Sequence, residues 1–279
     1  MKKLKKPKLS VKQIVYDCAN SYTEEAKRIR IQSEADYIEK ESDNYDLLAK
    51  ESLLFSISSG YIDKRNISKE EMIALYTDKF VKSKPIRSRY YDKIIVAAHD
   101  ICPLCCVGHV KTLDHYLPKS QYPIYSVTPV NLVPSCRDCN SKKGDVIISK
   151  KSKQPLHPYY DNIDDVIWLK AVLFKKNEGI VVDFFVDETL KNDNLDIYEK
   201  ALCHFNIYEL NSIFAIEASR EISENLLSWK KNLAKWGKQE FIDFLNDNIL
   251  SYEKSQKNTW KTALYRALKE NVNIINEIE

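Results

Sequence analysis

Glycine is scarce in this sequence, with five glycines among 279 residues. A turn-rich all-β fold uses glycine wherever the backbone needs positive φ, so this scarcity favours long helices. Long apolar runs are missing too, because none approaches the roughly 20 residues of a membrane-spanning helix. The basic start at residues 1–8 is not followed by the apolar region of a signal peptide. We therefore expect a cytoplasmic protein that makes no membrane contact.

The chain also lacks a large excess of charge of either sign, since its net charge is +3. Such a value does not indicate nucleic-acid binding by itself, so any basic surface must be local. The charged and hydrophobic fractions are ordinary for a soluble protein, which excludes wholesale disorder. The length allows one large core or two small ones.

Cysteine is the residue type whose arrangement is most informative. Seven cysteines occur, and in a reducing compartment they favour a metal site over disulfides. Four of them form two Cys-x-x-Cys pairs, Cys102 with Cys105 and Cys136 with Cys139. Zn²⁺ takes four soft ligands in a tetrahedron, and two such pairs supply four thiolates. The spacing predicts structural zinc, although many such sites belong to proteins that catalyse nothing.

Harder ligands lie between and just after the two cysteine pairs. Asp114 and Asn140 offer oxygen ligands suited to Mg²⁺ or a similar ion such as Mn²⁺, and His115 is free to deprotonate water. Asn140 directly follows the last cysteine, so a helix fixed by zinc would hold it against Asp114. Lys143, one turn further along, falls on the same face of that helix and can meet a phosphate.

Asn131 and His157 complete the set of candidates. Asn131 is placed to hydrogen-bond the backbone around His115. His157 lies between two prolines after a basic run and could bind a phosphate or the metal, but a histidine satisfied inside a rigid loop is an equally good interpretation. Each candidate is weak evidence alone, since asparagine at a helix start is a common cap. The prediction of catalysis depends on their order within one module.

Periodicity and turn signals divide the remaining chain into helical regions and a hairpin. We expect helices at 11–38, 45–57, 68–80 and 88–98, a strand at 109–113 ending at Asp114-His115, a loop at 117–130, an extended stretch at 131–134, a helix at 137–144, a hairpin at 166–174 and 180–186, and helices from 195 onward. The predicted regions are 1–99, helical; 100–161, the metal module; 162–190, the hairpin; and 191–279, helical. The fold class is α+β and mostly helical, with a central zinc-stabilised ββα module.

The motif order resembles a known family of nucleases. Cys-x-x-Cys, Asp-His-x-x-Pro, Asn-Leu and Cys-x-x-Cys-Asn-x-x-Lys together resemble the HNH endonucleases, which have a ββα-metal core. The resemblance implies that His115 is the general base, that Asp114 and Asn140 hold the divalent ion, and that Asn131 is the structural middle residue. It also implies that the four paired cysteines hold zinc.

The chain departs from the family pattern at two positions. Asn140 stands where many members carry a histidine, a variation that keeps metal ligation possible. Cys106 stands where glycine is frequent, and it could substitute for Cys105 as a ligand, although the two-residue spacing favours Cys105.

Weaker similarity extends to residues 112–120, 122–123, 157–161 and 258–265. These stretches resemble HNH proteins of bacterial anti-phage systems such as the Septu type, in which the nuclease accompanies an ATPase. The resemblance implies that the helical arms dock a partner or sense a trigger.

The function we expect is metal-dependent hydrolysis of nucleic acid, with DNA favoured as the substrate. Two alternatives stay open, namely a ribonuclease toxin that acts on transfer RNA and a zinc-stabilised binding or adaptor subunit without activity. The expected active-site residues do not separate DNA from RNA, because the chemistry does not require a 2′-hydroxyl.

Overall fold

A computed structural model describes residues 1–60, 65–177 and 179–277. The chain forms two compact units, which we call the N-terminal unit (Lys2–Asp161) and the C-terminal unit (Asn162–Glu279, with Met1). Position 178 of the predicted hairpin and positions 278–279 of the predicted helical region lie outside the described residues. No helix in the described part of the chain is long and apolar enough to cross a membrane.

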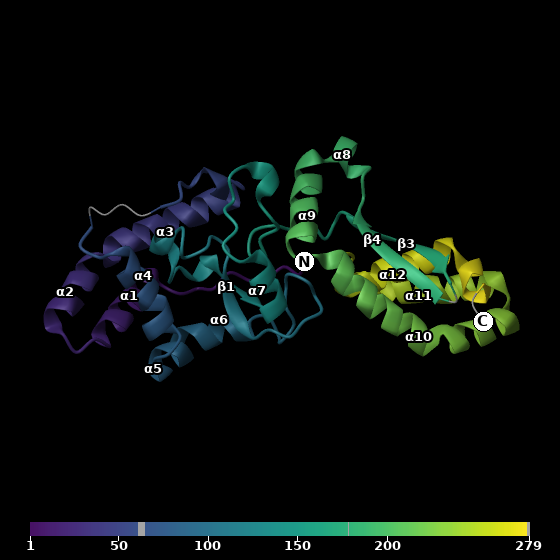
Figure 1. The fold of residues 1–279 in the computed structure, drawn as a ribbon, viewed down its shortest axis with the longest axis horizontal. Helices are drawn as coiled ribbons and strands as arrows, with labels where there is room; N and C mark the ends of the chain where they lie inside the picture. Colours follow the sequence, from purple (N-terminus) through teal and green to yellow (C-terminus); the bar gives the residue numbers. More distant parts are fainter. Residues whose placement is uncertain (61–64, 178, 278–279) are drawn as a thin grey trace. The chain divides into compact units, whose positions relative to one another are not determined.

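The described residues are mostly helical, with two small antiparallel sheets (Figure 1). The elements of the N-terminal unit are α1 (Val11–Asn20), α2 (Glu25–Ser33), α3 (Ala35–Lys50), α4 (Lys69–Ala74), α5 (Lys84–Ile86), α6 (Asp92–Val96), β1 (Thr112–His115), β2 (Leu132–Ser135) and α7 (Arg137–Lys143). Those of the C-terminal unit are β3 (Leu169–Lys176), β4 (Gly179–Val186), α8 (Leu190–Asp193), α9 (Leu195–Ile207), α10 (Leu210–Trp236), α11 (Lys238–Ser255) and α12 (Trp260–Glu270).

The helices before the cysteine module differ in their limits from those we expected. The helix expected at 11–38 is broken after α1, where the Ser21 hydroxyl donates to the Cys18 carbonyl and competes with the helical ladder. The helix expected at 45–57 overlaps only the last six residues of α3, which ends at Lys50 because Ser52 adopts a positive φ of 57°. The strand expected at 109–113 begins later, as β1 at Thr112.

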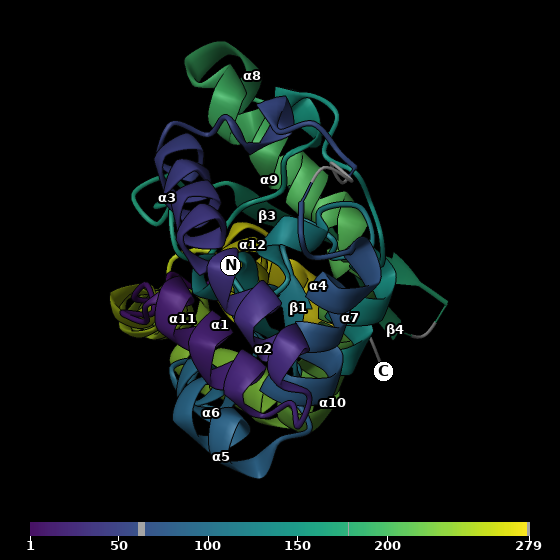
Figure 2. The same cartoon turned by 90° about the vertical axis from the view of Figure 1, so that its left-hand side faces the viewer.

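The core of the N-terminal unit packs its first helices against the two short strands. Helix α1 lies beside α2 and α3 (Figure 2), and the buried side chains of these helices belong to one cluster with Leu113 of β1 and Leu132 of β2. Two π-helical stretches, Leu75–Phe80 and Arg87–Tyr91, contribute aromatic rings to the same core. The helices therefore form the base on which the cysteine module lies.

Strands β1 and β2 and helix α7 form a compact ββα arrangement. The strands pair antiparallel, from Thr112 opposite Ser135 to His115 opposite Leu132. Helix α7 follows β2 after one residue, Cys136, and packs against β1. The connection between the strands is the predicted loop, which contains two single 3₁₀ turns.

The C-terminal unit is a hairpin covered by helices. Strands β3 and β4 pair from Leu169 opposite Val186 to Lys176 opposite Gly179, and α10 and α12 pack on them. Buried Asn258, just before α12, accepts hydrogen bonds from the backbone N–H groups of Trp168 and Leu169 and fixes the start of the hairpin.

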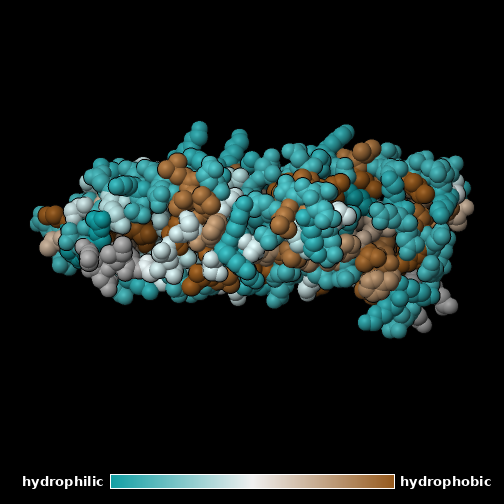
Figure 3. Space-filling view, turned by 90° about the horizontal axis from the view of Figure 1, so that it is seen from above, coloured by the Kyte–Doolittle hydropathy of each residue, from teal (hydrophilic) through white to brown (hydrophobic). Residues whose placement is uncertain are grey.

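On the face drawn in Figure 3, apolar side chains lie as separate patches among hydrophilic ones.

Candidate metal centre and the polar site beside it

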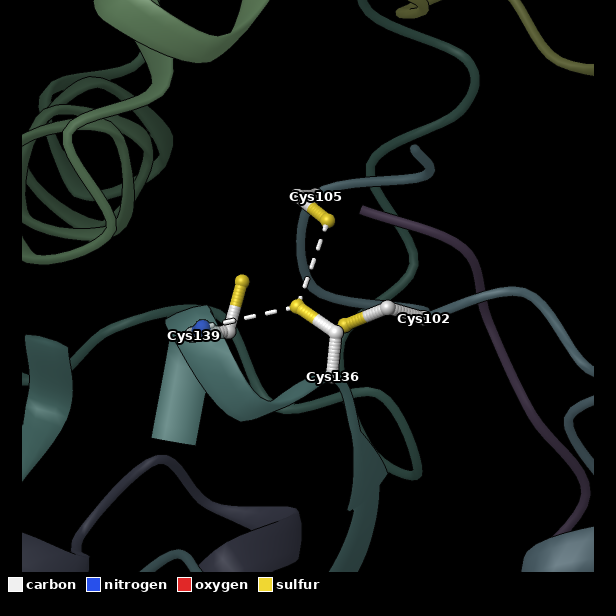
Figure 4. A group of neighbouring side chains, drawn as sticks. All are labelled: Cys102, Cys105, Cys136 and Cys139. Carbon is white, nitrogen blue, oxygen red and sulfur yellow. Dashed lines mark hydrogen bonds between the residues drawn. The ribbon is translucent and has the colours of Figure 1, made fainter. Parts of the chain in front are cut away.

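Four buried cysteines from the two Cys-x-x-Cys pairs meet in one cluster. The sulfur atoms of Cys102, Cys105, Cys136 and Cys139 lie within 4.8 Å of one another, and all four thiols are free (Figure 4). Zn–S bonds of about 2.3 Å in a tetrahedron place the sulfurs about 3.8 Å apart. The Cys105–Cys136 sulfur distance is 4.0 Å, which is close to that value and far from a disulfide bond. The cluster could therefore bind a metal such as zinc, with Cys105 rather than Cys106 as the ligand.

Backbone N–H groups form hydrogen bonds with two of the four sulfur atoms. The Gly108 and Cys139 N–H groups donate to the sulfurs of Cys105 and Cys136 at 3.3 and 3.4 Å. A hydrogen bond with Cys102 lowers the pKa of Cys105 to about 7, whereas hydrogen bonds among the sulfurs raise the pKa of Cys102 and Cys139. The lowered pKa favours the thiolate form, which binds metals, at Cys105. Cys136 is also the N-cap of α7, so the cluster joins the start of that helix to the first Cys-x-x-Cys pair.

Asp114 of β1 pairs with Lys143, the last residue of α7. The lysine Nζ is 3.3 Å from both carboxylate oxygens and 2.6 Å from the His115 carbonyl oxygen. The two side chains are 7% and 2% exposed, so each charge needs the other as its partner. Burial raises the pKa of Asp114, and the neighbouring Lys143 charge opposes that rise.

His115 is the last residue of β1 and is buried beside Tyr76. Its Nε2 lies 2.9 Å from the Ser126 carbonyl oxygen, and the Tyr76 ring meets it edge to face at a centroid distance of 4.3 Å. Burial, with a further contribution from the charge of Lys119, lowers the pKa of His115 to about 3. The imidazole is therefore neutral near pH 7.

Asn131 fixes the loop that carries the residues after His115. Its side chain accepts from the Leu117 N–H at 2.7 Å and donates to the carbonyl oxygens of Leu117 and Tyr125 at 3.1 and 3.2 Å. The Asn131 carbonyl oxygen accepts from the Tyr116 N–H. The residue is fully buried, and it ties both ends of the interstrand loop together.

Asn140 is oriented differently from our expectation. We expected it to lie against Asp114, but its Nδ2 donates to Thr112 Oγ1 at 3.3 Å, and the α7 residue that contacts Asp114 is Lys143. Asn140 lies opposite Thr112 at the start of β1, and Lys143, one helical turn further along α7, lies opposite Asp114. Thr112 and Asp114 share one face of β1, so Asn140 and Lys143 both contact that face of the strand.

His157 lies in a separate, buried aromatic cluster. Its Nδ1 accepts from the Tyr159 N–H at 3.2 Å, and its Nε2 lies 3.2 Å from the Tyr45 hydroxyl. Its ring centroid is 4.1 Å from that of Tyr116. Both ring nitrogens are engaged by protein groups, so the arrangement matches a histidine satisfied inside a rigid loop.

Three residues beside His115 were not among the sequence candidates: Tyr76, Lys119 and Ser126. Tyr76 comes from a distant π-helical stretch, and Ser126 contributes only its carbonyl oxygen, so no side-chain pattern could have indicated either. Lys119 follows His115 by four residues, and its Nζ lies 5.8 Å from the Tyr76 ring centroid. Its position in the Pro-Lys-Ser stretch just after His115 was the sequence feature that could have indicated it as a residue of the site.

The fold and the site define a mostly helical protein with a buried four-cysteine centre that could bind a metal such as zinc. No family model and no solved structure matches the chain. Protein ea31 of Escherichia phage lambda is 33% identical over 221 residues, which cover 73% of this chain and 73% of the phage protein. The chain belongs to the same family as protein ea31.

Proposed function

We propose that the chain is a metal-dependent endonuclease of the HNH type, in which His115 is the general base of phosphodiester hydrolysis. The observation that carries the proposal is the contact between His115 Nε2 and the Ser126 carbonyl oxygen. A carbonyl oxygen only accepts, so Nε2 holds the ring proton. Nδ1 then keeps the lone pair with which a neutral imidazole can take a proton from water.

Substrate binding would make His115 a stronger base. Part of the lowering of its pKa comes from the positive charge of Lys119. A phosphate group beside Lys119 would compensate that charge, and its own negative charge would favour the imidazolium form. The proton-accepting ability of His115 would thus rise when the substrate is in place.

Asp114 and Asn140 are the residues that would hold a divalent ion. A carboxylate and an amide oxygen suit Mg²⁺ or Mn²⁺, and such an ion supplies charge stabilisation to a phosphate and its leaving oxygen. In the structure the Asp114 carboxylate has the Lys143 ammonium as its cation. The Lys143 charge opposes the rise in the pKa of Asp114 that burial causes, and Lys143 is one turn of α7 from Asn140.

A cleavage assay tests the proposal. Plasmid DNA, single-stranded DNA and total transfer RNA are incubated with Mg²⁺ or Mn²⁺ and with wild type, His115→Ala or His109→Ala. Each reaction is run with and without the protein encoded by the neighbouring gene. His109 is an exposed histidine of the same module, so it is the matched control. We expect wild type and His109→Ala to cut and His115→Ala not to cut.

The same assay separates the remaining functions. Cutting of transfer RNA alone would favour a ribonuclease, and activity only with the neighbour would favour a partner-dependent defence nuclease. Cutting by His115→Ala at the wild-type rate would refute the role of the base. Binding without cutting under every condition would favour a zinc-stabilised binding subunit.

A further inference from the structure

A polar hollow lies beside Asn140, at the opposite end of α7 from the Asp114–Lys143 pair. Its volume is about 470 Å³, and it is lined by Lys111, Thr112, Arg137, Asn140 and Ser141. We propose that this hollow binds a backbone phosphate of nucleic acid, next to the phosphate that is cut. The inference rests on the proposed function, because it names where that substrate is held.

The charges of the hollow fit a phosphate. Lys111 and Arg137 are both exposed, and neither forms an ion pair among the described residues. None of the five lining residues is acidic, and Asp138, which follows Arg137, is not one of them. An arginine fork and an ammonium supply several donors to phosphate oxygens, and the Ser141 hydroxyl adds one more.

The two cations are attached to backbone that the module holds in place. The Lys111 N–H donates to the Ser135 carbonyl oxygen at 3.0 Å, which extends the pairing of β1 with β2. Arg137 directly follows Cys136, whose sulfur caps α7 and belongs to the cysteine cluster. Little backbone ordering is needed when a ligand binds, and this favours affinity.

The hollow has a suitable separation from the proposed reaction centre. Thr112 lines the hollow and is hydrogen-bonded to Asn140, while Asp114 is two residues further along β1. Two residues of a strand span about 6.6 Å, which is longer than the axial rise of about 3.4 Å per nucleotide in one strand of a duplex. A phosphate in the hollow and a phosphate at Asp114 would thus belong to different nucleotides of the same strand.

A binding experiment on the full chain tests the hollow. Fluorescence anisotropy measures the Kd of a labelled single-stranded DNA and of its duplex over a series of salt concentrations, without divalent ions. The test variant is Lys111→Met with Arg137→Met. The control is Lys40→Met with Lys93→Met, which removes two exposed charges of the same unit outside the hollow. The zinc content of every variant is measured to show that the cluster is intact.

We expect the slope of log Kd against log salt to fall by about 0.7–0.9 in the test variant, because the hollow holds one phosphate. The control should keep the wild-type slope. Equal slopes for test and control variants, or no binding by wild type, would overturn the inference. If wild type binds through the hollow but never cuts, the proposed reaction fails and the hollow stands. If wild type cuts and the two variants bind alike, the hollow fails and the nuclease stands.

Discussion

Gly108 should be needed for full zinc affinity although it provides no ligand. A Cβ at this position would lie 2.8 Å from the Cys136 Cβ and 2.9 Å from its sulfur. Carbon atoms in contact stay about 3.5 Å or more apart, so Gly108→Ala must move the loop or the cysteine by about 0.7 Å. Metal–ligand distances tolerate only about 0.2 Å. The tetrahedron cannot absorb the displacement without losing geometry.

The cost of this substitution can be worked out from the contacts that would be lost. Overpacking costs about 1–3 kcal/mol, and moving the loop also strains the Gly108 N–H bond to the Cys105 sulfur, whose loss costs about 1.5–3 kcal/mol because the acceptor is charged. Near the lower limit of these ranges, a total of about 3 kcal/mol corresponds to a loss of about 100-fold in zinc affinity.

Competition with a coloured zinc chelator measures this affinity directly. Gly179→Ala is the matched control, because its new Cβ would meet its nearest atom, the Lys176 carbonyl oxygen, at an ordinary 3.8 Å. We expect the control to bind zinc like wild type. A Gly108→Ala protein with an affinity within about threefold of wild type would refute the reasoning, because 3 kcal/mol is far outside that range.

Three further predictions concern stability. Removing the metal with excess strong chelator should lower the melting temperature, because metal-binding energy at such a site is folding energy; an unchanged melting curve after verified metal loss would contradict the scaffold role of the cluster. Asn131→Ala should cost about 3 kcal/mol in urea denaturation, since it leaves three buried backbone groups without their partner, and a cost below about 1 kcal/mol would count against the bracing role. The Arg30 guanidinium lowers the pKa of Glu71 to about 2, so the stability from this pair is complete above about pH 4.5 and is lost as the pH falls toward 2. At 19% exposure of Glu71 we expect a stabilisation of roughly 2 kcal/mol, of which roughly 1 kcal/mol is lost between pH 6 and pH 3. In urea denaturation at these two pH values, Glu71→Gln should not show that loss.

The elements of the cysteine module could be predicted from the sequence because their signals are local. Cys136, Cys139 and Gly144 mark the start and end of α7 within nine residues, and the structure confirms that helix. The hairpin and the helices after Leu195 were also readable from alternation and periodicity. The break after α1 was not, because apolar spacing continues through Tyr22 while a single hydroxyl, that of Ser21, ends the helix.

The side-chain partners in the site were harder to predict than the backbone. The sequence shows that Asn140 and Lys143 share a face of α7, but only the register of α7 against β1 decides which of them meets Asp114. That register depends on where the cysteine cluster fixes the first turn of the helix. The packing of α7 against β1 therefore decides whether Asn140 or Lys143 meets Asp114, a choice that the helical period alone leaves open.

The cluster holds the first turn of α7, whereas the Asp114–Lys143 pair holds its last turn. Because α7 has only seven residues, a displacement at one end reaches the other, and Asn140 lies between the two. Loss of the metal should thus disturb the surroundings of Asp114, while the ring of His115, held by Ser126 and Tyr76, should be disturbed less. The metal cluster thus supports the Asp114 half of the proposed site and the helical core supports the His115 ring, with Lys143 in contact with both residues.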